Sequence, residues 1–73
     1  KYQIINLSDL SILKAGKVDS ELLFKHGIIR KVDIPVKVLG NGDIEKKFEI
    51  EMNMFSKTAV EKIEKAGGKA IFI

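Results

Sequence analysis

The Gly-Asn-Gly-Asp segment at residues 40–43 constrains the fold more than any other part of this chain. Asn-Gly is typical of a type I′ turn, which needs positive φ at both central residues and joins the strands of a β-hairpin. Residues 36–39 before it have strand composition, and residues 44–52 after it alternate. The sequence therefore predicts a central hairpin. The core face of its second strand is expected to hold Ile44, Phe48, Ile50 and Met52, interrupted by Lys46.

The opposite face of residues 44–52 is acidic on balance, because it combines Glu45, Glu49 and Glu51 with Lys47. Such a face repels an anionic partner. We expect it to lie against water or a protein, and we expect any nucleic-acid contact at the hairpin tip and the helix ends.

A helix is predicted from Ser56 to Ala66, where a serine N-cap is followed by a helical stripe of small and aliphatic residues. Gly67 and Gly68 end it. Residues 69–73 are mostly apolar and are predicted to form a final, buried strand. The stripe consists of Ala59, Val60, Ile63 and Ala66.

The first half of the chain contains shorter predicted elements. Residues 2–7 read as a strand and residues 10–14 as one helical turn that ends at Gly16. Residues 21–26 read as a short helix capped by the Asp19-Ser20 pair. Pro35 fits the start of a strand or an edge strand, since it has no N–H to donate. Interleaved strands and helices over residues 1–73 predict one small α/β domain.

Composition narrows the class of partner. The net charge is +3, which mildly favours an anionic partner, and Arg30 is the only arginine among thirteen basic residues. Lysine suits point-charge contact with phosphate better than bidentate reading of bases. The chain has no cysteine and no long apolar run, so no disulfide, thiolate metal site or membrane span is expected.

No arrangement of residues predicts catalysis. His26 is the single histidine, no nucleophile motif surrounds any hydroxyl, and no metal-ligand spacing is present. We therefore expect no enzyme activity, no metal, no cofactor and no small-molecule substrate. The start of the predicted helix is open to two interpretations. Ser56 and Lys57 form either a phosphate site at a helix N-terminus or an ordinary N-cap with a solvated lysine.

One spacing resembles a known family. Lys37-Val38-Leu39-Gly40-Asn41-Gly42-x-Ile44 is followed by Phe55-Ser56-Lys57-x-Ala59-x-x-x-Ile63-x-x-x-Gly67. This pattern closely resembles the C-terminal signature of bacterial and organellar ribosomal protein fifteen of the large subunit. Similar segments occur at residues 2–10, 22–29 and 66–73, so the resemblance covers nearly the whole chain. Phe48 departs from the pattern, because a smaller aliphatic residue is usual there.

The resemblance implies a fold, a function and a location. The fold is an irregular β-β-α superhelix, and the function is a structural role in the large ribosomal subunit. The implied partners are large-subunit ribosomal RNA, bound by phosphate and shape contacts, and neighbouring ribosomal proteins. A role in subunit assembly is implied, and no catalysis. The location is the cytoplasm or an organelle. Family members begin with a long basic arm that these 73 residues lack, so the chain is expected to be a fragment.

Seven residues are predicted to contact RNA. The signature carries over Lys37, Asn41, Ser56 and Lys57, whereas charge and placement add Arg30, Lys31 and Lys46. An alternative is a protein-docking module between ribosomal proteins, in which the acidic face and the final strand form the surface.

Overall fold

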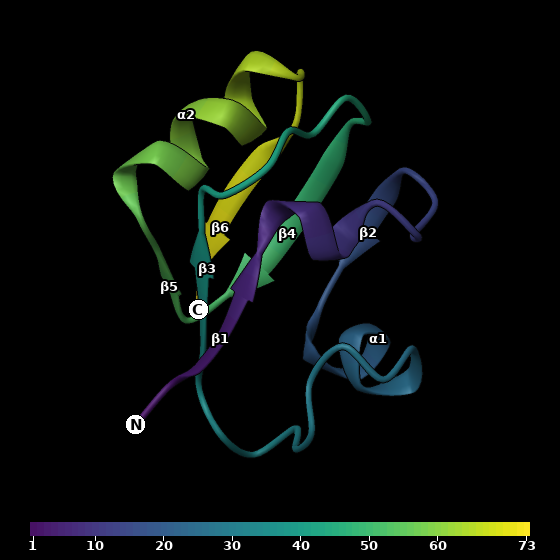
Figure 1. Cartoon of the computed structure of the whole chain (residues 1–73), viewed down its shortest axis with the longest axis vertical. Helices are drawn as coiled ribbons and strands as arrows, with labels where there is room; N and C mark the ends of the chain where they lie inside the picture. The colour runs from purple at the N-terminus through teal and green to yellow at the C-terminus, as the bar shows by residue number, and fades with distance from the viewer.

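The computed structural model describes all 73 residues, which fold into a small, compact α/β domain with two parallel sheets. One sheet has the order β1-β3-β5 and the other β2-β4-β6. Figure 1 shows the first sheet beside the helix α2, with α1 near the opposite end of the molecule. The elements are β1 (Gln3–Asn6), the 3₁₀ helix η1 (Leu7–Leu10), β2 (Gly16–Val18), α1 (Ser20–Lys25), β3 (Val36–Leu39), β4 (Phe48–Met52), β5 (Met54–Phe55), α2 (Lys57–Lys65) and β6 (Lys69–Phe72).

Successive strands alternate between the two sheets, and every pairing is parallel. The predicted central hairpin is therefore wrong. β3 lies between β1 and β5, and β4 lies between β2 and β6, so neither strand has an edge left for the other. Chain neighbours in sequence become central strands of different sheets, with residues 40–47 as the crossing loop.

Close packing, rather than a type I′ turn, explains the glycines of this loop. Gly42 has φ +88°, but Asn41 does not have a positive φ. A Cβ added at Gly40 would lie 2.8 Å from the backbone nitrogen of Ala59, at the first turn of α2. A Cβ at Gly42 would lie 2.6 Å from the Cβ of Ser8. The loop thus lies directly against both α2 and η1.

The core lies between the inward faces of the two sheets. All fifteen buried residues are apolar and form a single cluster. The predicted core face of β4 is confirmed, because Phe48, Ile50 and Met52 are buried. Ile44 is only partly buried, because residues 44–47 belong to the loop and not to the strand. α2 packs against β6 and β3 and buries Ala59 and Ile63 of its predicted stripe.

Both predicted helix starts are confirmed, since Asp19 caps α1 and Ser56 caps α2. The helical turn lies earlier than predicted, at Leu7–Leu10, where the carboxylate of Asp9 accepts the N–H of Asn6 at 2.8 Å. The final strand is not buried. β6 is an edge strand whose Phe72 is 56% exposed. Neither helix has the length or apolar character to cross a membrane.

Two strands escaped prediction, and Pro35 has a different place from one alternative. β2 and β5 are only three and two residues long, too short to show periodicity. Pro35 directly precedes β3, as predicted, but β3 is a central strand rather than an edge. Its carbonyl accepts the N–H of Gln3 at 2.7 Å, which extends the pairing with β1.

Candidate nucleic-acid interface

Lys37 lies at the centre of the outward face of the first sheet. The parallel register places it between Ile4 of β1 and Met54 of β5. Side chains alternate between the faces of a strand, so these three residues point away from the buried row Ile5, Val38 and Phe55. No hydrogen bond or ion pair occupies the ammonium group of Lys37. Its charge is therefore available to a ligand.

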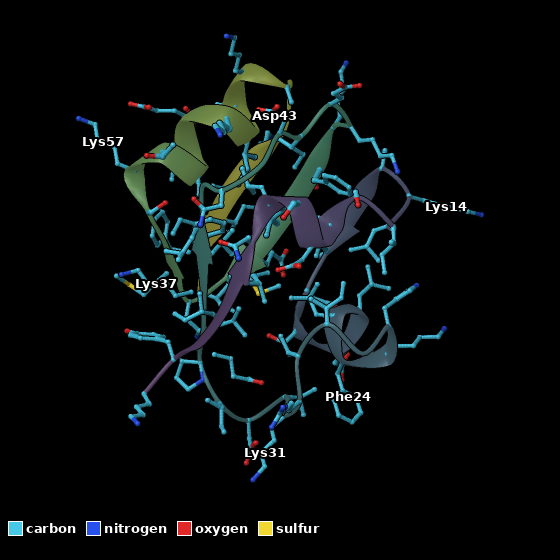
Figure 2. The ribbon with its side chains drawn as sticks, in the orientation of Figure 1. Lys14, Phe24, Lys31, Lys37, Asp43 and Lys57 are labelled. Carbon is cyan, nitrogen blue, oxygen red and sulfur yellow. The ribbon has the colours of Figure 1, made fainter.

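Lys57 begins α2 on the same side of the molecule, as Figure 2 shows. It is exposed and forms no ion pair. The preceding Ser56 has a structural role, because its Oγ accepts the N–H of Ala59 at 3.1 Å. Of the two interpretations of this helix start, the N-cap is directly seen. The structure does not test phosphate binding beside it, since the hydroxyl proton of Ser56 is still free to donate.

Arg30 and Lys31 lie in the turn between α1 and β3, and Figure 2 places Lys31 at the end of the molecule away from Lys57. The side chain of Gln3 holds this turn. Its Oε1 accepts the N–H groups of Arg30 and Lys31 at 2.9 and 3.2 Å, and its Nε2 donates to the carbonyls of Lys31 and Ile34. The two cationic side chains remain unpaired. Sequence reasoning missed Gln3, because nothing in a strand residue signals a bond to a distant turn.

Asn41 and Lys46 are already engaged by the protein. The amide of Asn41 donates to Oδ1 of Asn6 at 2.9 Å. The ammonium of Lys46 donates to the carbonyls of Ser11 and Leu13 at 3.1 and 2.7 Å. Both residues therefore tie the crossing loop to the segment that follows β1.

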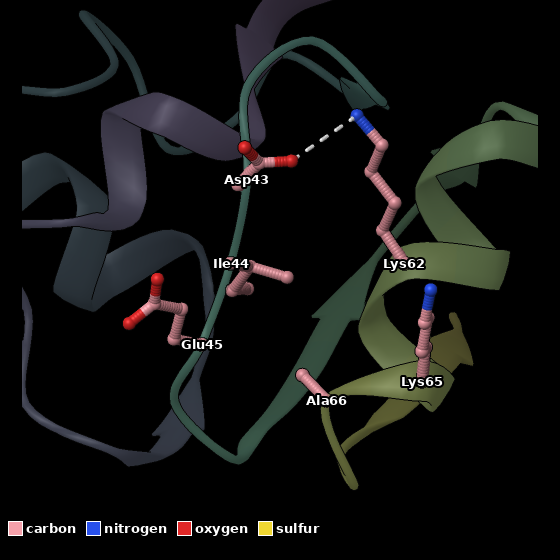
Figure 3. A pocket seen from close by; sticks show the side chains of 6 residues that line it. All are labelled: Asp43, Ile44, Glu45, Lys62, Lys65 and Ala66. Atoms are coloured by element: carbon pink, nitrogen blue, oxygen red, sulfur yellow. Dashed lines mark ion pairs between the residues drawn. The ribbon is translucent and has the colours of Figure 1, made fainter.

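Lys62 secures the other side of the crossing loop and was missed by sequence reasoning, which placed it on a solvated helix face. Its ammonium donates to the carbonyls of Gly40 and Gly42, both at 2.8 Å, and lies 3.9 Å from Oδ1 of Asp43. Figure 3 shows this ion pair at the mouth of a cleft between the loop and α2. The cleft is lined by Asp43, Ile44, Glu45, Lys62, Lys65 and Ala66.

We predict that Lys62→Met lowers the free energy of unfolding by roughly 1–3 kcal/mol, since it leaves two loop carbonyls without their cationic donor. Urea denaturation followed by circular dichroism measures the change. Lys65→Met is the matched control, because Lys65 lies one turn away and bonds to no protein group. Equal stability of the two variants would show that Lys62 does not hold the loop.

The acidic face differs electrostatically from its prediction. Glu49 is in register with Lys17 of β2 and Lys69 of β6, so its carboxylate lies in a row flanked by lysines. Glu51 forms an ion pair with Lys17 at 3.3 Å. The outward face of the second sheet therefore carries alternating charges, and only Glu45 of the predicted acidic set lies outside it, in the loop.

The chemistry of the remaining polar residues is structural. No group of histidine, aspartate and glutamate side chains is arranged to hold a metal ion. His26 is exposed at the end of α1, where its Nδ1 lies 3.0 Å from the carbonyl of Leu22. Its tautomer therefore carries the proton on Nδ1, which caps the helix.

Comparisons with known proteins agree with the resemblance. A family model that describes the ribosomal proteins 50S-L15 and 50S-L18e and their 60S counterpart matches residues 4–71. The chain is 44% identical over 70 residues to the large ribosomal subunit protein uL15 of Trichlorobacter lovleyi, an alignment that covers 94% of this chain and 47% of that protein. The chain thus spans about half the length of this relative. Both descriptions name ribosomal proteins and neither names an enzyme. The chain belongs to the ribosomal protein family that includes 50S-L15 and 50S-L18e.

Proposed function

We propose that this chain is a structural component of the large ribosomal subunit that binds ribosomal RNA by phosphate and shape contacts and supports subunit assembly. The observation that carries the proposal is the side of the molecule shared by Lys37 and Lys57, two unpaired cations on regular elements. Lysines on a fixed scaffold position phosphates without reading base sequence. The uL15 relative, named as a large-subunit protein, is consistent with this role.

The seven predicted residues divide into two roles under this proposal. Arg30, Lys31, Lys37 and Lys57 carry charges that no protein group neutralises, and we assign them to phosphate contact. Ser56 combines its capping bond with a place at the positive end of a helix. Asn41 and Lys46 act mainly by fixing the shape of the crossing loop that RNA contacts.

The return of the chain to each sheet in turn is consistent with the short superhelix that the family resemblance implies. Its irregular loops are the surface that would fit between RNA segments. Neighbouring large-subunit proteins are the other proposed partners, and the large subunit, in the cytoplasm or an organelle, is the proposed location. The alternating charges of the outward β4 face give no specific support to a separate protein-docking function.

Substitution at Ser56 separates its two possible roles. Ser56→Asp keeps an N-cap oxygen and should change stability little, whereas Ser56→Ala should cost about 1 kcal/mol. If phosphate lies at this helix start, Ser56→Asp weakens RNA binding by repulsion although the helix remains capped. Denaturation and RNA titration of both variants check this. Unchanged RNA affinity of Ser56→Asp would show that the serine only caps.

The function is tested by assembly. Lys57→Glu should reduce incorporation into large subunits, measured by sedimentation, because it reverses a proposed phosphate contact. Glu45→Lys is the matched control, a reversal of opposite sign at an exposed loop residue with no ion pair. A larger defect for Glu45→Lys than for Lys57→Glu would favour protein docking over RNA docking.

A further inference from the structure

The outward face of the first sheet is left uncovered by the fold. Parallel sheets are ordinarily covered on both faces. Here Ile4 of β1 is 53% exposed and Met54 of β5 is 38% exposed, on either side of Lys37. Tyr2 continues the alternation of β1 on the same face and is 47% exposed. These exposures show that nothing in the chain packs on this part of the sheet.

The charge of this face identifies the chemistry of what covers it. Its outward positions are Tyr2, Ile4, Asn6, Lys37, Leu39 and Met54, and none is acidic. Lys37 has no partner, and Asn6 is occupied by Asn41. An occupant must therefore be anionic opposite Lys37 and flat or apolar opposite Tyr2, Ile4 and Met54. A nucleotide combines both properties in one group, since a base stacks on an aromatic ring while its phosphate pairs with lysine.

We propose that this face binds an unpaired nucleotide of RNA, with the base stacked on Tyr2 beside Ile4 and Met54 and the phosphate at Lys37. The nucleotide is unpaired because bases inside an A-form helix do not present their faces to a protein. This inference rests on the proposed RNA-binding function and adds to it a specific contact: a stacked base rather than phosphate alone.

The composition of the chain supplies two reporters. Tyr2 is the only tyrosine and there is no tryptophan, so tyrosine fluorescence reports on this position alone. The chain has two methionines, of which Met54 lies on the face and Met52 is fully buried in the core. Methyl NMR of labelled methionine therefore gives a signal from the face and an internal control from the core.

The experiment titrates the chain with three probes of similar charge: single-stranded oligoadenylate, an RNA duplex of the same length, and inorganic polyphosphate. Oligoadenylate should quench the Tyr2 emission and shift the Met54 methyl signal while Met52 stays unchanged. Polyphosphate should bind without quenching. Tyr2→Ala should weaken oligoadenylate binding about tenfold, from the loss of one stacked base, and Tyr2→Phe should retain it. Neither variant should change polyphosphate binding.

The possible failures are distinguishable. If RNA binds in a salt-dependent way but Tyr2 and Met54 do not respond, the stacking proposal is overturned, the RNA-binding function stands, and a protein is left as the cover of this face. Quenching by polyphosphate equal to that by oligoadenylate, or a preference for the duplex, also overturns stacking. If neither RNA nor polyphosphate binds, the RNA-binding function itself fails.

Discussion

Phe48→Ala should lower the free energy of unfolding by about 3–5 kcal/mol, the usual cost of removing a buried phenylalanine. Phe48 is 1% exposed in the centre of the second sheet, so the truncation leaves a cavity that a central strand cannot close. A core of this size contributes roughly 3–5 kcal/mol in net stability. The variant should therefore be largely unfolded at 25 °C, as measured by circular dichroism and urea denaturation.

Phe24→Ala is the matched control for this prediction, because the same side chain is removed from a site that is 51% exposed. Its cost should be about 0.5 kcal/mol or less, as for most surface substitutions. A Phe48→Ala variant that is as stable as Phe24→Ala would contradict the packing described for the second sheet. The larger residue at Phe48, where relatives were expected to have a smaller one, would then have no structural importance.

Lys37→Glu combined with Lys57→Glu should produce the largest loss of RNA affinity of any pair of substitutions in the chain. Each replaces an unpaired cation on the proposed RNA side with a repelling anion. The slope of log affinity against log salt should fall in magnitude by about 2, one per lost phosphate contact, and affinity at low salt should fall on the order of 100-fold. Titration of labelled ribosomal RNA at several salt concentrations measures both quantities.

Lys14→Glu combined with Lys25→Glu is the control for net charge. Both lysines are exposed, and Figure 2 shows Lys14 on the opposite side of the molecule from Lys37 and Lys57. The two double variants change the net charge equally, so long-range repulsion affects them alike. An equal loss of affinity in both would mean that RNA recognises total charge and not the proposed side.

Elements specified by local chemistry were predicted well from the sequence. Ser56 and Asp19 cap their helices because a short polar side chain satisfies free N–H groups within the same turn. The buried alternation of Phe48, Ile50 and Met52 was also readable, since it depends on strand geometry alone. The strand at Val36–Leu39 was found for the same reason.

Features that depend on distant segments were not predictable. The Asn-Gly dipeptide favours a hairpin locally, but strand pairing is decided by partners far away in sequence, and both strands beside the turn found parallel ones. The glycines of the turn are required by the approach of Ala59 and Ser8, which no local pattern reveals.

The candidate site was predictable only in part, for the same physical reason. Lys37, Lys46, Lys57 and Lys62 are equivalent in composition, and the fold divides them. Lys46 and Lys62 meet backbone carbonyls of other segments, whereas Lys37 and Lys57 meet none. Which lysines remain available to RNA is therefore a property of the tertiary structure.

Amine-reactive labelling of the chain, free and in complex with large-subunit ribosomal RNA, tests the proposed RNA side most directly. Mass spectrometry of the labelled peptides gives the reaction rate of each lysine in both states. We predict that RNA slows the labelling of Lys37 and Lys57 strongly and leaves Lys14 and Lys25 as reactive as in the free chain. Unchanged labelling of Lys37 and Lys57, with protection of Lys14 and Lys25 instead, would contradict the proposal.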